Sequence, residues 1–278
     1  MNSMDPLMIG AVILILLTAF SFSPLGLGGG ALFVPILHYI VGFDMHLAIV
    51  ASLILVWSVA IGSRAAHEHD GFTAKKRGKK GIPTALVGAV IGALVAFMLI
   101  EHVSDLIIKA AAAGVLIWVI ARAAEKLRME SNGEAEPPEI KVEGEVLRKY
   151  RVGCFAGGAA SGMLGIGGGS VFVTIHRQFL GLDAHKAAGT SYIIESWMVP
   201  VGILTHLFIN GTAGDLAAEV GNPLYILLPL VVIGTAWLGA HYAIVHLPIK
   251  LITYGFIAAV SLSIVRYLLD IGMFIGAI

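Results

Sequence analysis

Long apolar stretches separated by short polar segments run through most of the chain. An α-helix needs about 20 apolar residues to cross a hydrocarbon core of ~30 Å. The stretches that meet this length are 45–66, 82–100, 104–123, 185–209, 222–245 and 249–269. Two further stretches, 30–41 and 169–180, would form helices of only about 18 Å. The pattern therefore predicts an all-α polytopic membrane protein that also contains two helices too short to span the bilayer.

A run of glycines precedes each short stretch. The runs are Gly26-Leu27-Gly28-Gly29-Gly30 and Gly165-Ile166-Gly167-Gly168-Gly169. Glycine costs about 1 kcal/mol relative to alanine in a helix interior, so three in succession end a helix. Irregular backbone at membrane depth must be buried in protein or face water. We therefore expect 7–41 and 152–180 to be re-entrant-like helical hairpins whose glycine tips lie near the middle of the membrane.

The second half of the chain repeats the first. At an offset of 139, residues 21–53 align with 160–192 without a gap, and 13 of the 33 positions are identical, including both glycine runs. Apolar composition alone would not align glycines, aspartates and histidines together. The chain is expected to consist of a first membrane repeat (1–123), a charged linker (124–151) and a second membrane repeat (152–278).

The basic residues indicate that the two repeats have opposite orientations. Residues 75–80 contain five lysines and arginines, whereas the equivalent loop, 211–221, contains none. Lysine and arginine are retained on the cytoplasmic side of a membrane. We therefore expect the linker 124–151 and the loop 71–81 to be cytoplasmic and both termini external. Each inverted repeat would then hold one broken hairpin followed by three transmembrane helices, an arrangement found in secondary transporters.

Composition narrows the class of protein further. Hydrophobic residues make up 58% of the 278 residues and charged residues only 13%, and the mean hydropathy is +0.90. Soluble domains carry about 25% charged residues, so a soluble enzyme is excluded. The formal net charge of zero gives no reason to expect a nucleic-acid partner. With one cysteine, Cys154, the chain has no intramolecular disulfide and no thiolate metal cluster, and we expect no cofactor.

The glycine tips are the candidate binding site for an anion. A helix that begins at a tip presents unpaired N–H groups and a partial positive charge, and glycine lets an oxyanion approach the backbone. Serines at equivalent positions of the following long helices are placed to donate to the same anion. The candidate substrate-binding residues are Gly28, Gly29, Gly30, Ser52, Gly167, Gly168, Gly169 and Ser191.

Glu195 is the main candidate for ion coupling. It lies about ten residues from either end of a predicted span, and intramembrane carboxylates usually line a pathway or relay protons. A structural ion pair with Arg64 or with a histidine is the alternative. His67, His206 and Arg64 are further coupling candidates, although we expect the two histidines near the membrane surface and solvated. The run His67-Glu68-His69-Asp70 does not place two histidines one helical turn apart, so we predict no metal site there.

The two glycine motifs resemble those of a known family. The pattern Gly-x-Gly-Gly-Gly-x-x-x-Val-Pro at 26–35 is followed by Ala-x-x-x-Ser at 48–52, and both recur at 165–191 except that Thr174 replaces the proline. This doubled pattern is similar to that of the sulfite exporter TauE/SafE family. The resemblance implies an inner-membrane permease for sulfur-containing anions such as sulfite, sulfoacetate or other organosulfonates.

The leading hypothesis is a secondary transporter, not an enzyme, that alternates access around the glycine tips and exports a small anion. Its expected partners are that anion and the lipid bilayer, with a proton or another ion as the coupling candidate and a homodimer as a candidate assembly. One alternative is a divalent-metal permease, because the chain holds ten histidines. Another is an intramembrane hydrolase that uses Ser52 or Ser191 with a histidine from a different helix.

Overall fold

The computed structural model describes residues 6–102, 104–131, 140–208, 213–219, 223–246, 249–274 and 276. These residues are helical apart from short connections, with no β-strand among them. In the first half the helices are α1 (Pro6–Phe22), α2 (Gly30–Pro35), α3 (Met45–His69), α4 (Lys75–Gly78), α5 (Ile82–His102) and α6 (Asp105–Ser131). In the second half they are α7 (Gly144–Leu164), α8 (Gly169–Leu180), α9 (Ala184–Phe208), α10 (Ala213–Glu219), α11 (Pro223–His246) and α12 (Ile249–Phe274).

Five helical stretches of the described chain are long and apolar enough to cross a membrane: Pro6–Leu25, Met45–His69, Lys75–His102, Asp105–Glu125 and Thr253–Phe274. The prediction of an all-α polytopic membrane protein is thus confirmed. Two of the six predicted spans are absent from this group. The described apolar part of α11 is short, Ile226–Tyr242. α9 has 25 residues but is more polar, which its position allows because residues 187–195 are all buried inside the protein.

The glycine runs interrupt the helices as predicted, and the following helices begin at Gly30 and Gly169. A short 3₁₀ turn, Ser23–Leu25, lies between α1 and the first break. Three glycines of each break have positive φ angles, from +66° to +80°. Only glycine adopts this left-handed conformation at little cost. They are Gly26, Gly28 and Gly29 in the first break, and Gly165, Gly167 and Gly168 in the second.

The two short helices differ because one contains a proline. Pro35 has no N–H group and so cannot continue the α-helical hydrogen-bond pattern, and the six residues after it, Ile36–Val41, wind as a π-helix. At the equivalent position Thr174 donates a 3.0 Å side-chain hydrogen bond to the carbonyl of Ser170. α8 therefore continues as a regular α-helix to Leu180.

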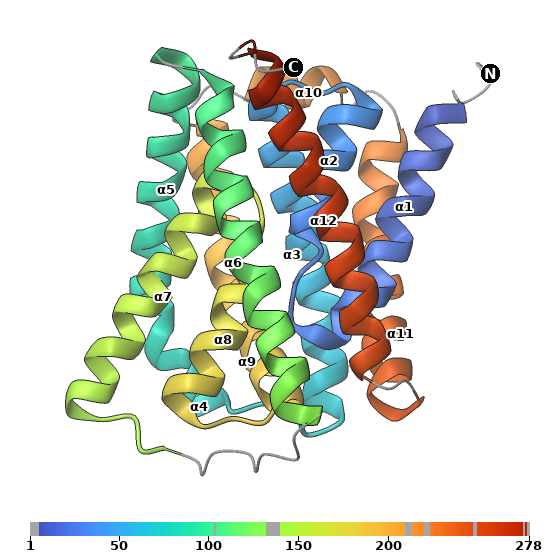
Figure 1. Ribbon diagram of the computed structural model, residues 1–278. Helices are drawn as coiled ribbons and strands as arrows, with labels where there is room; N and C mark the ends of the chain where they lie inside the picture. Colours follow the sequence, from blue (N-terminus) through green and yellow to red (C-terminus); the bar gives the residue numbers. More distant parts are fainter. Residues whose placement is uncertain are drawn as a thin grey trace.

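Figure 1 shows that α1 begins and α12 ends at one end of the helical bundle. α4 lies at the other end, together with the end of α6 and the beginning of α7. We call the second of these the linker end. α6 continues to Ser131 and α7 begins at Gly144, so both helices extend into the segment that we expected to be a linker. Residues 132–139 of that segment lie outside the described residues.

The two halves pack closely against each other through small residues. α5 runs along α7, and a Cβ added at Gly88 would lie 2.2 Å from the carbonyl oxygen of Phe155, while one at Gly158 would lie 2.2 Å from that of Ala85. Such close backbone approach is typical of packing between membrane helices. α3 packs against both α9 and α11. The two long helices that follow the short helices, α3 and α9, therefore lie together at the centre of the bundle.

Candidate functional site

The two glycine breaks lie directly against each other. A Cβ added at Gly169 would be 2.2 Å from the carbonyl oxygen of Gly26, and one added at Gly30 would be 2.6 Å from the carbonyl carbon of Ile166. No side chain fits between the backbones at these points. The beginning of each short helix therefore touches the break of the opposite half.

The contacts between the halves are reciprocal. Ser52 donates a 2.7 Å hydrogen bond to the carbonyl of Gly165, and its equivalent, Ser191, lies 3.3 Å from the carbonyl of Gly26, the residue equivalent to Gly165. Likewise Gly28 approaches Glu195, while its equivalent Gly167 approaches Val56, which is equivalent to Glu195. Contacts that recur with the partners exchanged are the signature of a two-fold relation.

Both serines are fully buried, and in this conformation their hydroxyl groups face carbonyl oxygens. Ser191 also lies 2.8 Å from the carbonyl of Ala188 in its own helix. The histidines of the same long helices contact other carbonyls, His67 that of Ser63 and His206 that of Gly162, each at 2.8 Å. Within the described part of the chain, neither Ser52 nor Ser191 therefore pairs with a histidine, and no observation favours a hydrolase. That the serines bind an anion stays a prediction.

Glu195 lies where the two breaks meet. Its two carboxylate oxygens are each 3.0 Å from the position that a Cβ would take, one at Gly28 and the other at Gly169. The residue is fully buried, and neither oxygen has a hydrogen-bond partner among the described residues. The nearby Ser191 hydroxyl is directed to backbone carbonyls instead. A buried polar group without a partner calls for a functional explanation.

The structural alternative for Glu195, an ion pair with Arg64, is wrong. Arg64 lies near the linker end of α3 and pairs with Glu68, one helical turn further along, with 2.8 Å between Nε and Oε1. The carboxylate of Glu68 also pairs with Lys75 at 3.0 Å. Arg64 therefore belongs to a surface ion-pair network, and its proposed part in coupling has no contact that supports it here.

The expectation that His67 and His206 are solvated is also wrong, because both are fully buried. Near the linker end, Gly189 packs closely against both His67 and Phe72. A Cβ added at Gly189 would lie 2.1 Å from the carbonyl oxygen of Phe72 and 2.8 Å from the Cβ of His67. The His67 ring lies 5.7 Å from that of Tyr192. Tertiary packing at the helix ends, which the apolar pattern does not reveal, accounts for the difference.

One group of side chains in the described part of the chain has the arrangement of a metal site: His69, Asp70 and His241. Sequence reasoning considered the first two but not His241, which comes from α11. Asp70 accepts hydrogen bonds from both histidines, at 2.8 and 3.0 Å. Partial burial raises the pKa of the Asp70 carboxyl, but these hydrogen bonds outweigh it and hold the pKa below its usual range. The group lies at the end of α3, away from the breaks, and does not favour metal transport.

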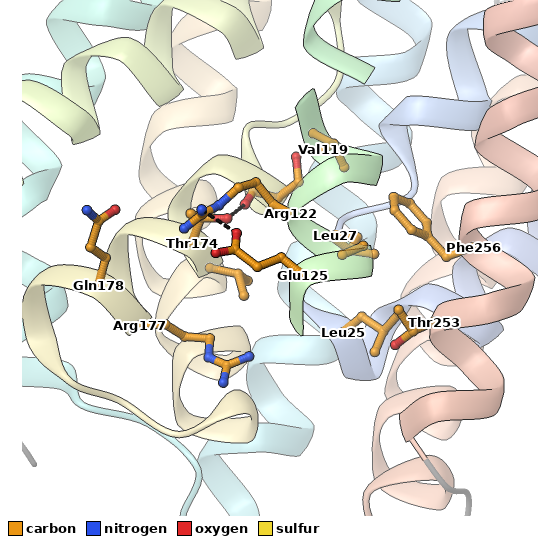
Figure 2. A pocket seen from close by; sticks show the side chains of 13 residues that line it. Leu25, Leu27, Val119, Arg122, Glu125, Thr174, Arg177, Gln178, Thr253 and Phe256 are labelled. Atoms are coloured by element: carbon orange, nitrogen blue, oxygen red, sulfur yellow. Dashed lines mark hydrogen bonds and ion pairs between the residues drawn. The ribbon is translucent and has the colours of Figure 1, made fainter. Parts of the chain in front are cut away.

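A cavity of about 530 Å³ lies between α6, α8 and α12 and reaches the first glycine break. Figure 2 shows its lining side chains, with Leu25, just before the first break, and Leu27, within it, on the side of Thr253 and Phe256. Its lining residues are Leu25, Leu27, Val119, Arg122, Ala123, Glu125, Ser170, Val173, Thr174, Arg177, Gln178, Thr253 and Phe256. It therefore lies between the linker-end half of α6, helix α8 and the first glycine break.

The polar lining of the cavity suits a small anion. Arg122 pairs with Glu125 on its own helix, whereas Arg177 lines the cavity with no ion-pair partner among the described residues. The side chains of Ser170, Thr174 and Thr253 add hydroxyl groups. Guanidinium groups bind oxyanions through several directed N–H groups. Sequence analysis missed Arg122 and Arg177 as site residues, because nothing in the hydrophobic pattern or the repeat brings these two positions together.

Comparison with known proteins identifies the family of the chain. The family model of the sulfite exporter TauE/SafE family matches residues 11–267, which include both glycine breaks, Glu195 and the cavity. No curated protein and no solved structure matches the chain. The chain belongs to the sulfite exporter TauE/SafE family of membrane transporters.

Proposed function

We propose that this chain is a secondary transporter that exports small sulfur-containing anions such as sulfite, sulfoacetate or other organosulfonates. The observation that carries the proposal is the cavity beside the first glycine break, which is lined by three hydroxyl groups and by Arg177, a residue with no ion-pair partner in the described part of the chain. Glu125 offsets the charge of Arg122, so Arg177 leaves the lining with a net positive charge, and a concave site of net positive charge concentrates anions. A sulfite or sulfonate group offers oxygens that these donors can bind.

The substrate is proposed to move from this cavity to the breaks, where the N–H groups of Gly28, Gly29 and Gly30 and of Gly167, Gly168 and Gly169 would be exposed to it. In the present conformation those backbones are packed together, so binding at the midplane requires the two halves to separate slightly. Ser52 and Ser191 would then release their carbonyl partners and donate to the anion. Arg177 holds the anion before this step.

Alternating access is supported by the reciprocal contacts of the two halves. If the repeats are inverted, the same contacts, with the halves exchanged, produce a second conformation that is open at the opposite end. The positive-inside distribution supports a cytoplasmic location for loop 71–81 and the linker end and an external location for both termini. The cavity at the linker end is then the entrance from the cytoplasm, as export requires.

Proton coupling is assigned to Glu195. Its carboxylate lies between Gly28 and Gly169 without a hydrogen-bond partner among the described residues, so a change in its charge acts directly on the surface where the halves meet. An ionised carboxylate there would repel a bound anion, while a protonated one would not. Substrate and proton would therefore be bound together.

Counterflow in proteoliposomes tests the function. Vesicles loaded with unlabelled sulfoacetate should accumulate labelled sulfoacetate from the medium, and external sulfite or another organosulfonate should compete with the label. Protein-free vesicles and vesicles loaded with chloride alone are the controls. If none of these anions produces counterflow by protein whose folding is confirmed, the proposed substrate class is wrong. Uptake of a divalent metal by the same vesicles would favour the metal-permease alternative.

A further inference from the structure

A second group of charged side chains lies at the end of the bundle opposite the linker end. The carboxylate of Asp270 accepts a hydrogen bond from Tyr39 at 2.8 Å and pairs with Lys109 at 2.7 Å and with Arg266 at 3.1 Å. We call these four residues the Asp270 cluster. The ring of Tyr39 also lies beneath both cations, 5.6 Å from the Nζ of Lys109 and 4.5 Å from the Cζ of Arg266.

The Asp270 cluster joins three elements from both halves of the chain. Tyr39 comes from the π-helical segment Ile36–Val41, Lys109 from α6, and Arg266 and Asp270 from α12. The side chains of Lys109 and Asp270 are only 8% and 12% exposed. A buried charge is stable only while it is paired. The burial of Lys109 therefore depends on its counter-ions. These are Asp270 and, at 3.2 Å, Asp105.

The cluster occupies the place that the cavity occupies in the other half. The offset of 139 that relates the hairpins takes Tyr39 to Gln178, which lines the cavity. α6 begins at Asp105 and α12 at Ile249, so equivalent positions in these helices are 144 apart. Lys109 is then equivalent to Thr253, and Arg266 is equivalent to Arg122. Thr253 and Arg122 both line the cavity. Three of the four cluster positions thus correspond to positions that line the cavity at the linker end, and at the opposite end these positions hold an ion-pair cluster.

We propose that the Asp270 cluster is the outer gate of the transport path, and that the transported anion opens it by replacing the Asp270 carboxylate on Lys109, Arg266 and Tyr39. The proposal rests on the proposed function, and it identifies a second anion site at the exit. The cavity at the linker end and the gate at the other end are then equivalent regions of the two repeats, of which the first is open and the second is closed.

The chemistry of the exchange is balanced in charge. A carboxylate and a sulfonate or sulfite group both present oxygens that accept hydrogen bonds from an ammonium, a guanidinium and a phenol. The anion can thus neutralise Lys109 and Arg266 when Asp270 leaves them. Asp270 lies near the end of α12, within two turns of Phe274. A ligand that binds the open state better than the closed state shifts the population toward the open state.

Accessibility of a cysteine behind the gate tests the proposal. Ala31 in α2 is equivalent to Ser170, which lines the cavity, so Ala31→Cys reports whether the outer end is open. Intact cells carrying this variant are treated with a membrane-impermeant maleimide, with and without external sulfoacetate. Lys79→Cys at the linker end, which should stay unlabelled in intact cells, is the control for sidedness. Asp270→Asn and Tyr39→Phe are then each combined with Ala31→Cys.

We expect slow labelling of Ala31→Cys alone and faster labelling when sulfoacetate is added. Asp270→Asn should raise the rate about tenfold or more, because it removes the charge-assisted bonds that close the gate, and sulfoacetate should then have little further effect. Tyr39→Phe should give an intermediate rate, and it decides the matter if Asp270→Asn does not fold. Rates equal to that of the parent in every folded variant overturn the gate, whereas absence of counterflow in the wild-type protein overturns the proposed function.

Discussion

The hydroxyl of Ser52 lies 2.7 Å from the carbonyl oxygen of Gly165, so the long helix of the first half is tied to the glycine break of the second. Gly165 is the first residue of that break, directly after α7, and has a φ of +70°. Its carbonyl cannot bond within a helix that ends there. The equivalent contact in the other direction, from Ser191 to the carbonyl of Gly26, ties the long helix of the second half to the first break. Neither break can therefore change shape without disturbing the opposite half.

Replacing Ser52 with alanine should therefore loosen the contact between the halves. The change leaves the buried carbonyl of Gly165 without this donor, and an unsatisfied buried acceptor costs about 1–3 kcal/mol. We expect a lower Tm of the purified protein in detergent and reduced sulfoacetate counterflow.

Ser58→Ala is the matched control for Ser52→Ala. Ser58 is also buried in α3, but its hydroxyl bonds to the carbonyl of Ile54 in its own helix at 3.0 Å. That carbonyl keeps its helical backbone partner when the hydroxyl is lost. Equal losses of Tm and counterflow in the two variants would show that the contact between Ser52 and Gly165 has no special role.

The break geometry itself can be tested at Gly167. A Cβ there would lie 2.3 Å from the Cγ1 of Val56, and the φ of +80° would be strained for any side chain. Residues forced into such a conformation cost about 1–3 kcal/mol. Gly167→Ala should abolish counterflow or sharply reduce it. Adding Val56→Ala should restore part of the thermal stability, because it removes the steric clash but not the backbone strain.

Gly114→Ala provides the comparison. Gly114 lies within α6, and a Cβ there would meet nothing within 4 Å. Alanine favours a helix by about 1 kcal/mol over glycine, so this variant should keep full counterflow and a Tm at least as high as the wild type. If Gly167→Ala behaves in the same way, the left-handed break is not needed for transport.

The sequence predicts the local features of this fold well because they depend on short-range rules. The helices begin at Gly30 and Gly169 as expected, since consecutive glycines end a helix wherever they occur. The membrane class follows from composition and from the lengths of the apolar stretches, which tertiary contacts do not change. The internal repeat is visible because glycines and polar residues align together.

The site is less predictable because it depends on which helices cross. Arg122 and Arg177 are 55 positions apart, and they line one cavity only because α6 packs beside α8. The partner of Asp70, His241, comes from a helix 171 positions away. Glu195 was recognised as unusual from its depth alone, but its position between Gly28 and Gly169 could not be derived without the packing of the two breaks.

Arg177→Gln tests the cavity as the entrance. Losing the guanidinium removes the cation that is proposed to attract the substrate. Because charged hydrogen bonds contribute about 1.5–3 kcal/mol, we expect a KM for sulfoacetate raised about tenfold when the anion is offered from the linker side. Counterflow at saturating substrate should change much less. The measurement uses inside-out membrane vesicles, in which the linker end faces the medium under the proposed topology.

Lys149→Gln is the control for loss of one positive charge. Lys149 is an exposed residue of α7 that pairs with Glu145 at 2.8 Å and does not line the cavity. It should leave the KM unchanged. Equal shifts in both variants would mean that the general surface charge, and not the cavity, attracts the anion.

Asp70, which lies at the linker end, should make the thermal stability of the protein depend on pH. Hydrogen bonds from His69 and His241 outweigh its partial burial and lower its pKa from the usual 3.8. A lowered pKa in the folded state contributes stability that is present above the ordinary value and lost as the pH falls through the folded value. The Tm of the wild type should therefore approach that of Asp70→Asn as the pH falls below about 4. A constant difference in Tm between pH 7 and pH 3 would contradict this.

Glu195→Gln tests proton coupling most directly, because glutamine keeps the size of the side chain between Gly28 and Gly169 but cannot ionise. If the carboxylate carries the coupled proton, the variant should still exchange sulfoacetate for sulfoacetate, yet its exchange rate should no longer vary with pH between 5 and 8. Net export driven by a pH gradient, followed with a pH-sensitive dye inside the vesicles, should be lost. Glu195→Asp retains an ionisable group and should preserve a pH-dependent rate, which separates loss of the proton from a change in packing. A Gln variant whose pH profile and proton movement match those of the wild type would leave Glu195 with a packing role only, and the coupling ion would have to bind elsewhere.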